Sequence, residues 1–323
     1  MSYNTFRDCL YWEVNMITKL EEILQLAQNG EKSILAVAAA QDEEVLTAIK
    51  SAVEIDIINP ILVGDKKEIQ RIANDIELDL NDIKIIDSCD LKESAEIAIK
   101  LVSNNEADFV MKGILDTSIL LKAVLNKEFG LRTNSLLSHV MLYSISNYHK
   151  LLILTDGGMN INPSYEDKVK ILKNAIEATK PLGLEKIKVA CLSAKEKVNP
   201  KMLSTVDAGL LVDIAKNGEF GDDIVVEGPL AFDLAISKEA SLIKKFKSEV
   251  SGDVDILLVP TIEVGNALGK SFTYIGKSSS AGVIMGAKAP VVLTSRADTA
   301  ETKLYSIAYG AIIAKNNKIR TNQ

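Results

Sequence analysis

Short apolar runs alternate with longer amphipathic stretches along most of this chain. The run SILAVAAA at 33–40 is followed at 42–54 by a stretch with apolar residues at helical spacing, and the alternation continues to ADFVMKG at 107–113. Short β-rich runs separated by helices of roughly 10–15 residues are typical of a parallel sheet with helices on both faces. We therefore expect an α/β fold, preceded by an amphipathic helix that runs from Met16 and ends at Gly30.

The rhythm changes between residues 135 and 155. Two β-leaning runs, SLLSHVMLYSI and KLLILTDGG, are separated only by SNYH, which is too short for a crossover helix. Strands with so short a connection pair as antiparallel neighbours, so we expect a domain junction near residue 150. Beyond it the alternation resumes and ends in a helix over about 299–315. No linker rich in Pro, Gly or Ser separates the halves, so we expect two domains that pack across a cleft.

Length and composition agree with a two-domain enzyme. The chain has 323 residues, and no run approaches the roughly 18 to 20 apolar residues that a membrane span requires. A formal net charge of −7 disfavours nucleic-acid binding, which depends on clustered Lys and Arg. The first residues lack the pattern of a secretion signal, and three widely spaced cysteines, Cys9, Cys89 and Cys191, suit a reducing compartment. We expect a cytoplasmic protein.

Several common cofactor and catalytic patterns are missing from the sequence. No G-x-G-x-x-G follows the first strand, and His and Cys do not occur at metal-ligand spacing. We interpret the two histidines, His139 and His149, as structural, since they lie in or beside an expected strand. The run TIEVGNALGKSF resembles a phosphate-binding P-loop, but Val264 takes the place of the first glycine. We therefore interpret this run as the start of a helix.

Four segments combine the end of a strand, a polar turn and the start of a helix. Such turns expose backbone N–H groups and the positive end of a helix dipole, which favour anions such as phosphate. The alternative is that each segment only turns the chain. In the first segment we expect Asn162 to cap a helix that begins with Pro163. The segments are 154–164, 225–233, 259–266 and 293–299.

The segment LTSRADT at 293–299 offers the most specific chemistry. Ser295 and Arg296 follow an expected buried strand, where a hydroxyl can bond a thiol or an oxyanion and a guanidinium can bind phosphate through two parallel bonds. The alternative is a helix cap beside a surface arginine. Arg132, in GLRTNSLLSHV, is a candidate for a second positive group across the cleft, and its alternative is a solvated loop residue.

Taken together, these segments resemble the phosphate acetyl/butyryl transferase family over nearly the whole chain, from about Met16 to Ala314. The order and spacing of the segments are highly specific, although no single segment is decisive. The resemblance is carried by VAAAQDEEVL, MKGILDTSILLKAVLNKEFGLRT, LTDGGMNINPSYEDKV, VEGPLAFDLAIS, DILLVPTIEVGN and AGVIMGAKAPVVLTSRADTAETKLYSIA.

The resemblance implies a two-domain, three-layer α/β fold with parallel or mixed sheets, similar to that of the isocitrate and isopropylmalate dehydrogenases. The first domain is expected to hold residues 1–149 and 297–323, with 1–15 as an extension, and the second to hold 150–296. The active site is expected in the cleft between them.

The resemblance also assigns residues to the site. It implies that Ser295 and Arg296 are catalytic, and the residues expected to bind phosphate or CoA are Arg132, Thr133, Asn162, Gly265, Asn266 and Asp298. Acetyl-type members place an Asp seven positions after the serine, where this chain has Thr302, and the adjacent Glu301 should face another side of the helix. Without that Asp, activation of the thiol is expected to rest on positive potential from arginines and helix N-termini.

The butyryl-type branch of the family resembles this chain more closely, through ILTSRAD-like and KLYSIA-like runs. We expect reversible transfer of a butyryl group between CoA and inorganic phosphate, with no metal and with CoA only as substrate or product. We also expect a homo-oligomer and coupling to an acyl kinase.

Three alternatives to butyryl transfer stay open. The first is the same reaction on acetyl-CoA, and the second is a CoA-binding protein without catalysis. The third is a metal- and NAD-dependent decarboxylating dehydrogenase on a similar fold. That reaction requires clustered Asp ligands, and the one close pair, Asp222 and Asp223, falls in an expected turn.

Overall fold

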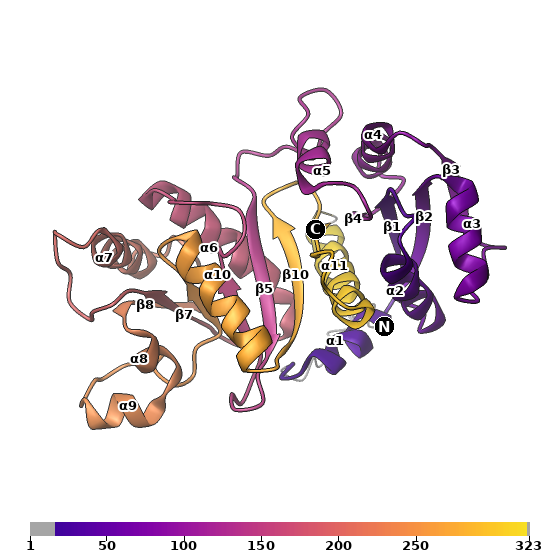
Figure 1. Cartoon of the computed structure of the whole chain (residues 1–323). Helices are drawn as coiled ribbons and strands as arrows, with labels where there is room; N and C mark the ends of the chain where they lie inside the picture. The colour runs from indigo at the N-terminus through magenta and orange to yellow at the C-terminus, as the bar shows by residue number, and fades with distance from the viewer. Residues whose placement is uncertain (1–16, 322–323) are drawn as a thin grey trace, which may run out of the picture.

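The computed structural model describes residues 17–321, so the expected extension at 1–15, Met16 and Cys9 lie outside the described part. Helices and strands alternate over most of this length (Figure 1). In chain order the elements are α1 (Leu20–Gln28), β1 (Ser33–Ala38), α2 (Glu43–Glu54), β2 (Ile58–Gly64), α3 (Lys66–Asp75), β3 (Lys84–Asp87), α4 (Leu91–Ser103), β4 (Phe109–Lys112), α5 (Thr117–Val124), β5 (Ser138–Ser144), β6 (Leu152–Thr155), α6 (Tyr165–Thr179), η1 (Lys180–Leu182), β7 (Ile187–Leu192), α7 (Leu203–Lys216), β8 (Ile224–Leu230), α8 (Phe232–Ile236), α9 (Lys238–Ile243), β9 (Ile256–Leu258), α10 (Ile262–Lys270), η2 (Ser271–Ile275), β10 (Ser279–Met285), β11 (Val291–Val292) and α11 (Ala300–Thr321).

The described strands form one 11-stranded sheet in the order β3-β2-β1-β4-β11-β10-β5-β6-β9-β7-β8. The first five strands in this order run parallel to one another, and so do the last four. Between these two parallel blocks, β10 is antiparallel to both of its neighbours, and β5 is antiparallel to β6. The α/β class and the mixed sheet are therefore confirmed, and the two blocks form the two halves of the molecule in Figure 1.

The antiparallel pair expected around residue 150 is formed by β5 and β6. Leu142 lies opposite Ile153, and residues 145–151 connect the two strands. Hydrogen bonding continues across both expected domain boundaries, since β10 pairs with β5 and β11 pairs with β4. β11 thus lies in the first parallel block, although the boundary at residue 296 assigns it to the second domain. The division of the chain at residues 149 and 296 stays a prediction.

Polar residues in the turns between strands and helices cap the first turns of several helices. The carboxylates of Asp42 and Asp65 accept hydrogen bonds from backbone N–H groups in the first turns of α2 and α3, which satisfies donors that a helix start leaves unpaired. Helix α6 begins with a reciprocal pair, in which Ser164 Oγ accepts from Asp167 N and Asp167 accepts from Ser164 N. The prediction that Asn162 caps this helix is wrong, because this capping box lies two residues later.

Apolar side chains form one continuous core on one face of the sheet and two separate cores on the other. Successive residues of β1 alternate between the faces, as a strand requires: Leu35 and Val37 belong to the continuous core, whereas Ala36 and Ala38 face the opposite side. The continuous core packs α1, α2, α3, α6, α7 and α11 against both parallel blocks. Of the separate cores, one lies under α4 and α5 and the other under α8 and α10. The gap between these two leaves room for a cavity.

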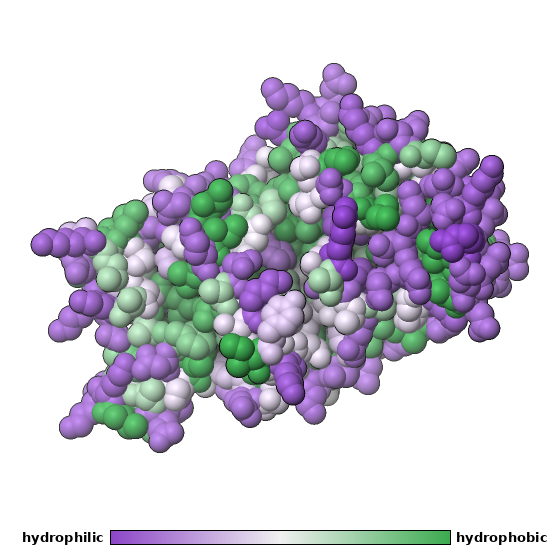
Figure 2. Space-filling model, in the orientation of Figure 1, coloured by the Kyte–Doolittle hydropathy of each residue, from purple (hydrophilic) through white to green (hydrophobic). Residues whose placement is uncertain are grey.

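The surface carries no helical membrane anchor within residues 17–321, since none of these helices has both the length and the apolar character to cross a bilayer. The face in Figure 2 is largely hydrophilic, with apolar patches over several elements. Leu242 and Ile243 of α9 are examples of exposed apolar residues. Helix α9 lies at the periphery of the molecule, away from the central strands β5 and β10 (Figure 1). Single exposed apolar side chains are ordinary on a folded protein.

Candidate active site

A cavity of about 600 Å³ lies over the centre of the sheet, on the face that has two separate cores. Residues two apart on a strand point to the same face, so alternate residues of the two central strands form the floor. The floor residues are His139, Met141 and Tyr143 of β5 and Ser280, Gly282 and Ile284 of β10. Two walls rise from this floor. The β4–β11 wall comprises residues 112–117 and 293–298, and the β6–α10 wall comprises residues 157–159 and 265–274.

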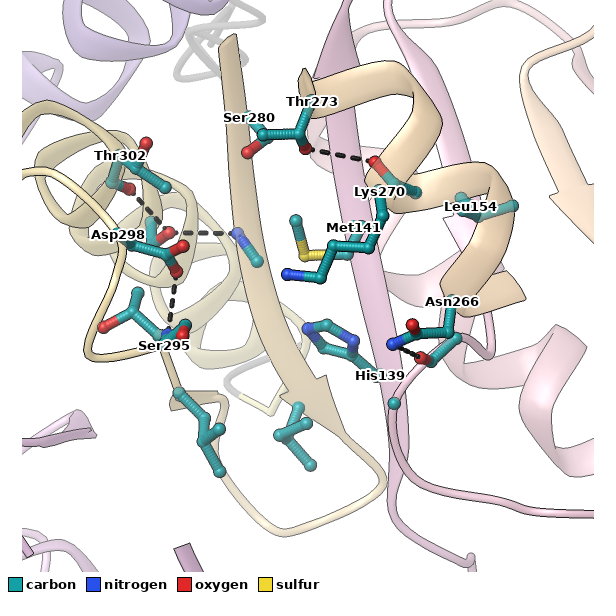
Figure 3. Close-up of a pocket in the computed structure, with 18 of the residues that line it drawn as sticks. His139, Met141, Leu154, Asn266, Lys270, Thr273, Ser280, Ser295, Asp298 and Thr302 are labelled. Carbon is teal, nitrogen blue, oxygen red and sulfur yellow. Dashed lines mark hydrogen bonds between the residues drawn. The ribbon is translucent and has the colours of Figure 1, made fainter. Parts of the chain in front are cut away.

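The β4–β11 wall carries the predicted Ser295–Arg296 pair in the turn between β11 and α11. Asp298 Oδ2 accepts a hydrogen bond of 2.7 Å from Ser295 N, which fixes this turn. Arg296 Nη2 donates to Ile114 O at 3.2 Å and to Asp116 Oδ1 at 3.1 Å. Ser295 and Arg296 are exposed and line the cavity, and Figure 3 shows Ser295 and Asp298 together on this wall.

The same wall contains a buried cation that the sequence reasoning missed. The Lys112 side chain, at the end of β4, is only 6% exposed, and its ammonium donates to Gly113 O at 3.0 Å and to Leu115 O at 3.3 Å. No carboxylate of residues 17–321 lies within ion-pair distance of it. Burial, together with the nearby Arg296, lowers the pKa of Lys112. A buried ammonium without a carboxylate partner is costly, so this wall is suited to an anion.

The β6–α10 wall is built on a close backbone contact. A Cβ on Gly157 would lie 2.8 Å from Gly265 C, and one on Gly265 would lie 2.6 Å from Gly157 Cα, so only glycine fits on either side. The predicted residue Asn266 lines the cavity, with Nδ2 3.5 Å from Gly157 O. Lys270 is exposed, and its ammonium points into the cavity in Figure 3. The run that resembles a P-loop is α10, with Val264 in its first turn, which confirms its interpretation as a helix.

The loop after β6 does not offer the free N–H groups that its sequence suggests. The carboxylate of Asp156 accepts hydrogen bonds from the backbone N–H groups of Gly158, Met159 and Asn160 and from Asn160 Nδ2. The carboxylate of Asp156 therefore already occupies the N–H groups of this turn that could otherwise bind a phosphate. The predicted residue Asn162 is exposed and does not line the cavity, and neither does the segment 225–233.

Arg132 and Thr133 lie before β5, outside the lining of the cavity. Arg132 is exposed. Thr133 Oγ1 donates to Gly286 O at 2.6 Å and accepts from Ser135 N at 3.0 Å, so it ties this segment to the turn between β10 and β11. A role for Arg132 or Thr133 in binding phosphate or CoA stays a prediction. The predicted residues that the cavity does bring together are Ser295, Arg296, Gly265, Asn266 and Asp298.

The first turns of α11 approach the cavity beside Ser295. Thr302 lines the cavity, and its backbone N–H donates to Thr299 Oγ1 at 3.3 Å. Glu301 is exposed and faces Tyr305, whose hydroxyl donates to Glu301 Oε1 at 3.4 Å. As the helix geometry predicts, Glu301 therefore does not take the place of the acetyl-type Asp.

His139 lies on the cavity floor, a position that its interpretation as a structural strand residue overlooked. Its ring fits between two glycines, since a Cβ on Gly158 would lie 2.6 Å from His139 Nδ1 and one on Gly282 would lie 3.2 Å from His139 Nε2. Burial lowers the pKa of His139 and favours the neutral imidazole. His149 is different, because its Nε2 lies 2.9 Å from Asp253 Oδ1 at an exposed site away from the cavity.

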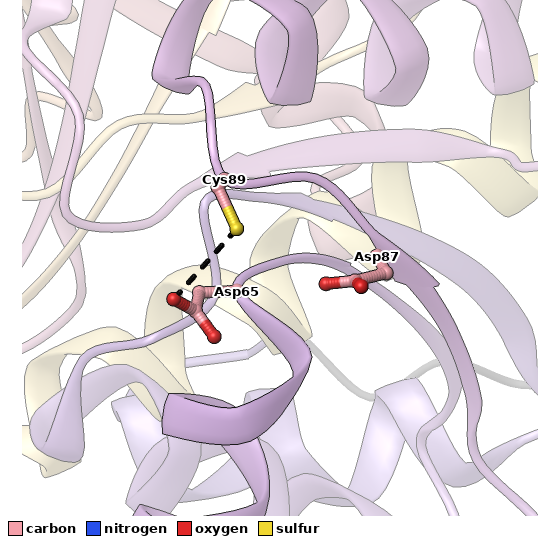
Figure 4. A group of neighbouring side chains, drawn as sticks. All are labelled: Asp65, Asp87 and Cys89. Atoms are coloured by element: carbon pink, nitrogen blue, oxygen red, sulfur yellow. Dashed lines mark hydrogen bonds between the residues drawn. The ribbon is translucent and has the colours of Figure 1, made fainter.

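Within the described residues, one group of carboxylate and thiol atoms comes close enough together to hold a metal ion: Asp65, Asp87 and Cys89 (Figure 4). These side chains have other partners, since Asp65 and Asp87 accept from backbone N–H groups at the start of α3 and Cys89 Sγ donates to Asp65. None of them lines the cavity. Asp222 and Asp223 lie in the expected turn, before β8, and also outside the lining.

A mixed sheet whose central strands form the floor of a cavity, with a serine–arginine turn on one wall and closely packed glycines on the other, defines an α/β protein with a candidate active site over the centre of its sheet. A family model described as "Phosphate acetyl/butaryl transferase" matches residues 18–98 and 90–311. The chain belongs to this family.

Named relatives agree with the family. The chain is 45% identical over 303 residues to phosphate butyryltransferase of Clostridium beijerinckii, covering 94% of this chain and 100% of that protein. It is 40% identical over 295 residues to phosphate acetyltransferase of Thermotoga maritima, covering 91% and 99%. A crystal structure of a branched-chain phosphotransacylase from Enterococcus faecalis has a TM-score of 0.77 and 35% identity, covering 87% and 99%. The family resemblance and the two-lobed α/β fold expected from the sequence are confirmed.

Proposed function

We propose that the protein is an acyltransferase that moves a butyryl group reversibly between CoA and inorganic phosphate. In one direction, butyryl-CoA and phosphate give butyryl phosphate and CoA. The observation that carries this proposal is the placement of Ser295, Arg296 and Lys112 on one wall of a cavity whose floor includes apolar side chains. The name of the Clostridium beijerinckii relative supports butyryl as the acyl group.

Phosphate binds at the β4–β11 wall in this proposal. The guanidinium of Arg296 offers two parallel hydrogen bonds to a phosphate, and Lys112 adds a second, more deeply placed charge. Arg296 now pairs with Asp116, but both side chains are exposed, at 67% and 72%. An exposed ion pair of this kind contributes about 0–1 kcal/mol, so it does not prevent Arg296 from binding a phosphate dianion as well.

The acyl group lies over the floor, where apolar side chains of β5, β6 and β10 line the cavity. The hydroxyl of Ser295 then bonds the sulfur or the oxyanion that forms when the carbonyl is attacked. Positioning and electrostatics supply the catalysis, and no covalent intermediate with the enzyme is required. CoA takes part as substrate or product, and we propose no metal and no further cofactor. The apolar residues of the floor and its rim are Met141, Leu154, Ile284 and Leu293.

The test is thiol release from a series of acyl-CoA thioesters, from acetyl to hexanoyl, in phosphate buffer. Butyryl-CoA should give the highest kcat/KM. A preference for acetyl-CoA would replace the proposal with the acetyl reaction, which the Thermotoga maritima relative supports. CoA binding without thiol release would indicate a binding protein, and hydride transfer from a 2-hydroxy acid to NAD would indicate a dehydrogenase.

Three further parts of the proposal concern the setting of the reaction. A CoA thioester and an acyl phosphate suit an enzyme of the cytoplasm, and an acyl kinase is the natural consumer of the acyl phosphate. We also propose a homo-oligomer. Sedimentation velocity tests the oligomer, and butyrate formation that depends on ADP and added kinase tests the coupling.

A further inference from the structure

Attack by CoA on an acyl phosphate requires the thiol to lose its proton. Cysteine thiols have a pKa of about 8.5, so a comparable thiol is mostly protonated near pH 7, and the thiolate is the nucleophile. A positioned base that accepts the proton in the transition state raises the rate, typically by about 10²–10⁴-fold. The following inference rests on the proposed acyl transfer, and it concerns which side chain is that base.

The carboxylates that line the cavity already have partners. Asp116 accepts from Arg296 at 3.1 Å, and Asp298 accepts from Ser295 N at 2.7 Å. Thr302, on the cavity side of α11, has no ionisable group. The exposed carboxylate of Glu301 faces Tyr305. Among the lining residues that the structure describes, a free carboxylate base is therefore lacking.

An imidazole occupies the floor of the same cavity. His139 is partly buried, and neither of its ring nitrogens has a hydrogen-bond partner among residues 17–321. Gly158 lies beside Nδ1 and Gly282 lies beside Nε2, and neither residue has a side chain that could form a hydrogen bond with these nitrogens. Figure 3 shows the ring between Lys270 and Ser295, facing the cavity space. This geometry leaves an acceptor nitrogen available to a ligand.

The charges around His139 keep a neutral ring available. Burial lowers its pKa most strongly, and Lys270 of the β6–α10 wall acts in the same direction. Asp156 at the end of β6 and Asp298 of the β4–β11 wall act in the opposite direction, which stabilises an imidazolium once it forms. β10 contributes only the uncharged Ser280, Gly282 and Ile284 to the floor.

We propose that His139 is a catalytic residue, which accepts the thiol proton when CoA attacks butyryl phosphate. An imidazole nitrogen takes the S–H proton while sulfur forms a bond to the carbonyl carbon. The C–O bond to phosphate breaks, phosphate leaves with the electron pair, and the imidazolium returns its proton to a phosphate oxygen or to water. In the other direction the imidazole takes a proton from hydrogen phosphate as a phosphate oxygen attacks the thioester carbonyl. The C–S bond breaks, and CoA leaves as a thiolate that receives this proton from the imidazolium.

The first test compares His139→Gln with His149→Gln in the direction that consumes CoA. Glutamine keeps the polarity and much of the bulk of histidine but cannot relay a proton. At pH 7 the kcat/KM for CoA of His139→Gln should fall about 100-fold. The deficit should shrink as the pH approaches about 8.5, because more of the thiol then ionises by itself. His149→Gln should keep the activity and the pH profile of the wild type.

The second test separates proton transfer from packing. His139→Ala empties the space between Gly158 and Gly282 that the imidazole ring occupies. Added imidazole should restore activity to His139→Ala but not to Ser295→Ala. A loss in His139→Gln that is the same at every pH, together with no rescue by imidazole, would mean that His139 only fills space. Full activity of His139→Gln at pH 7 would also overturn the proposal.

The third test does not require turnover. The sequence contains two histidines, so the imidazole NMR signals can be assigned with His149→Gln. CoA should shift the signal of His139, whereas ADP, which lacks the pantetheine thiol, should not. Absence of that shift overturns the role of His139 even where the wild type transfers butyryl groups. Absence of transfer by the wild type with every acyl-CoA would instead overturn the proposed function.

Discussion

The two walls of the cavity differ in how they carry positive charge. On the β4–β11 wall, Lys112 is 6% exposed and contacts only backbone carbonyl groups, with Arg296 beside it. On the β6–α10 wall, Lys270 is exposed and lies 5.7 Å from the ring centre of Tyr274. A buried cation needs an anion, whereas an exposed one is stabilised by water. The difference supports the proposal that phosphate binds at the β4–β11 wall, and it predicts that the β6–α10 wall contacts the larger substrate.

The largest effect should come from removing the predicted pair on the first wall. Ser295→Ala combined with Arg296→Ala removes an oxyanion donor and the bidentate phosphate ligand. Removal of one oxyanion donor typically lowers kcat by about 10²–10³-fold, so the loss of both groups should lower kcat/KM at least about 10³-fold in the thiol-release assay. Both residues are exposed, so the melting temperature should change little. Arg71→Ala on α3 is the matched control, and equal loss in that variant would contradict the assignment.

A comparison of Lys112→Met with Lys270→Met tests the two walls directly. Lys112→Met should raise the Kd for phosphate about tenfold, whereas Lys270→Met should leave it unchanged. At a phosphate concentration of 100 times the wild-type Kd, ligand binding stabilises the fold by about 2.7 kcal/mol. A tenfold weaker site reduces this to about 1.4 kcal/mol, which thermal unfolding with and without phosphate can measure. If Lys270→Met weakens phosphate binding as much, the contrast between the walls is wrong.

The elements that could be predicted from the sequence are those with local signals. The alternation of apolar runs and helices gives the α/β class, and the short SNYH connection gives the antiparallel β5–β6 pair. The position of Ser295 at the end of a strand also follows from local pattern. Lys112 could not be found in this way, because Arg296 comes close to it only through the pairing of β11 with β4, two strands that lie far apart in the sequence.

The same limit applies to His139. Strand periodicity places it on one face of β5, but only the gap between two separate cores decides whether that face meets a helix or a cavity. The two glycines beside its ring come from β10 and from the loop after β6. Local propensities contain no information about which strands become neighbours in the centre of a sheet.

A smaller effect is expected from the floor. A methyl group in Gly269→Ala would lie 2.7 Å from the hydroxyl of Tyr143, so the ring should move into the space that holds the acyl chain. The kcat/KM for butyryl-CoA should fall about tenfold relative to acetyl-CoA, a discrimination typical of one or two methylene groups. Adding Tyr143→Phe removes the clashing hydroxyl and should restore part of the butyryl activity. An unchanged ratio would place the acyl chain elsewhere.

The smallest effect concerns stability and pH. The pKa of His139 is lowered in the folded protein, so below about pH 6.5 the unfolded chain binds a proton that the folded one does not. The free energy of unfolding should therefore decrease as the pH falls below 6.5, by at most about 1.4 kcal/mol per pH unit from this group. Urea unfolding of the wild type and of His139→Gln between pH 5 and 7 measures the difference. Parallel curves for the two proteins would contradict it.

The order of the strands has a consequence for the growing chain. β10 and β11 come late in the sequence, yet they fill the gap between β4 and β5. Until residues 279–292 leave the ribosome, both inner strands have an unpaired edge, and such edges can associate with other chains. A nascent chain that stops before Ser279 cannot join its halves. The cavity floor and the β4–β11 wall are thus completed only near the end of translation.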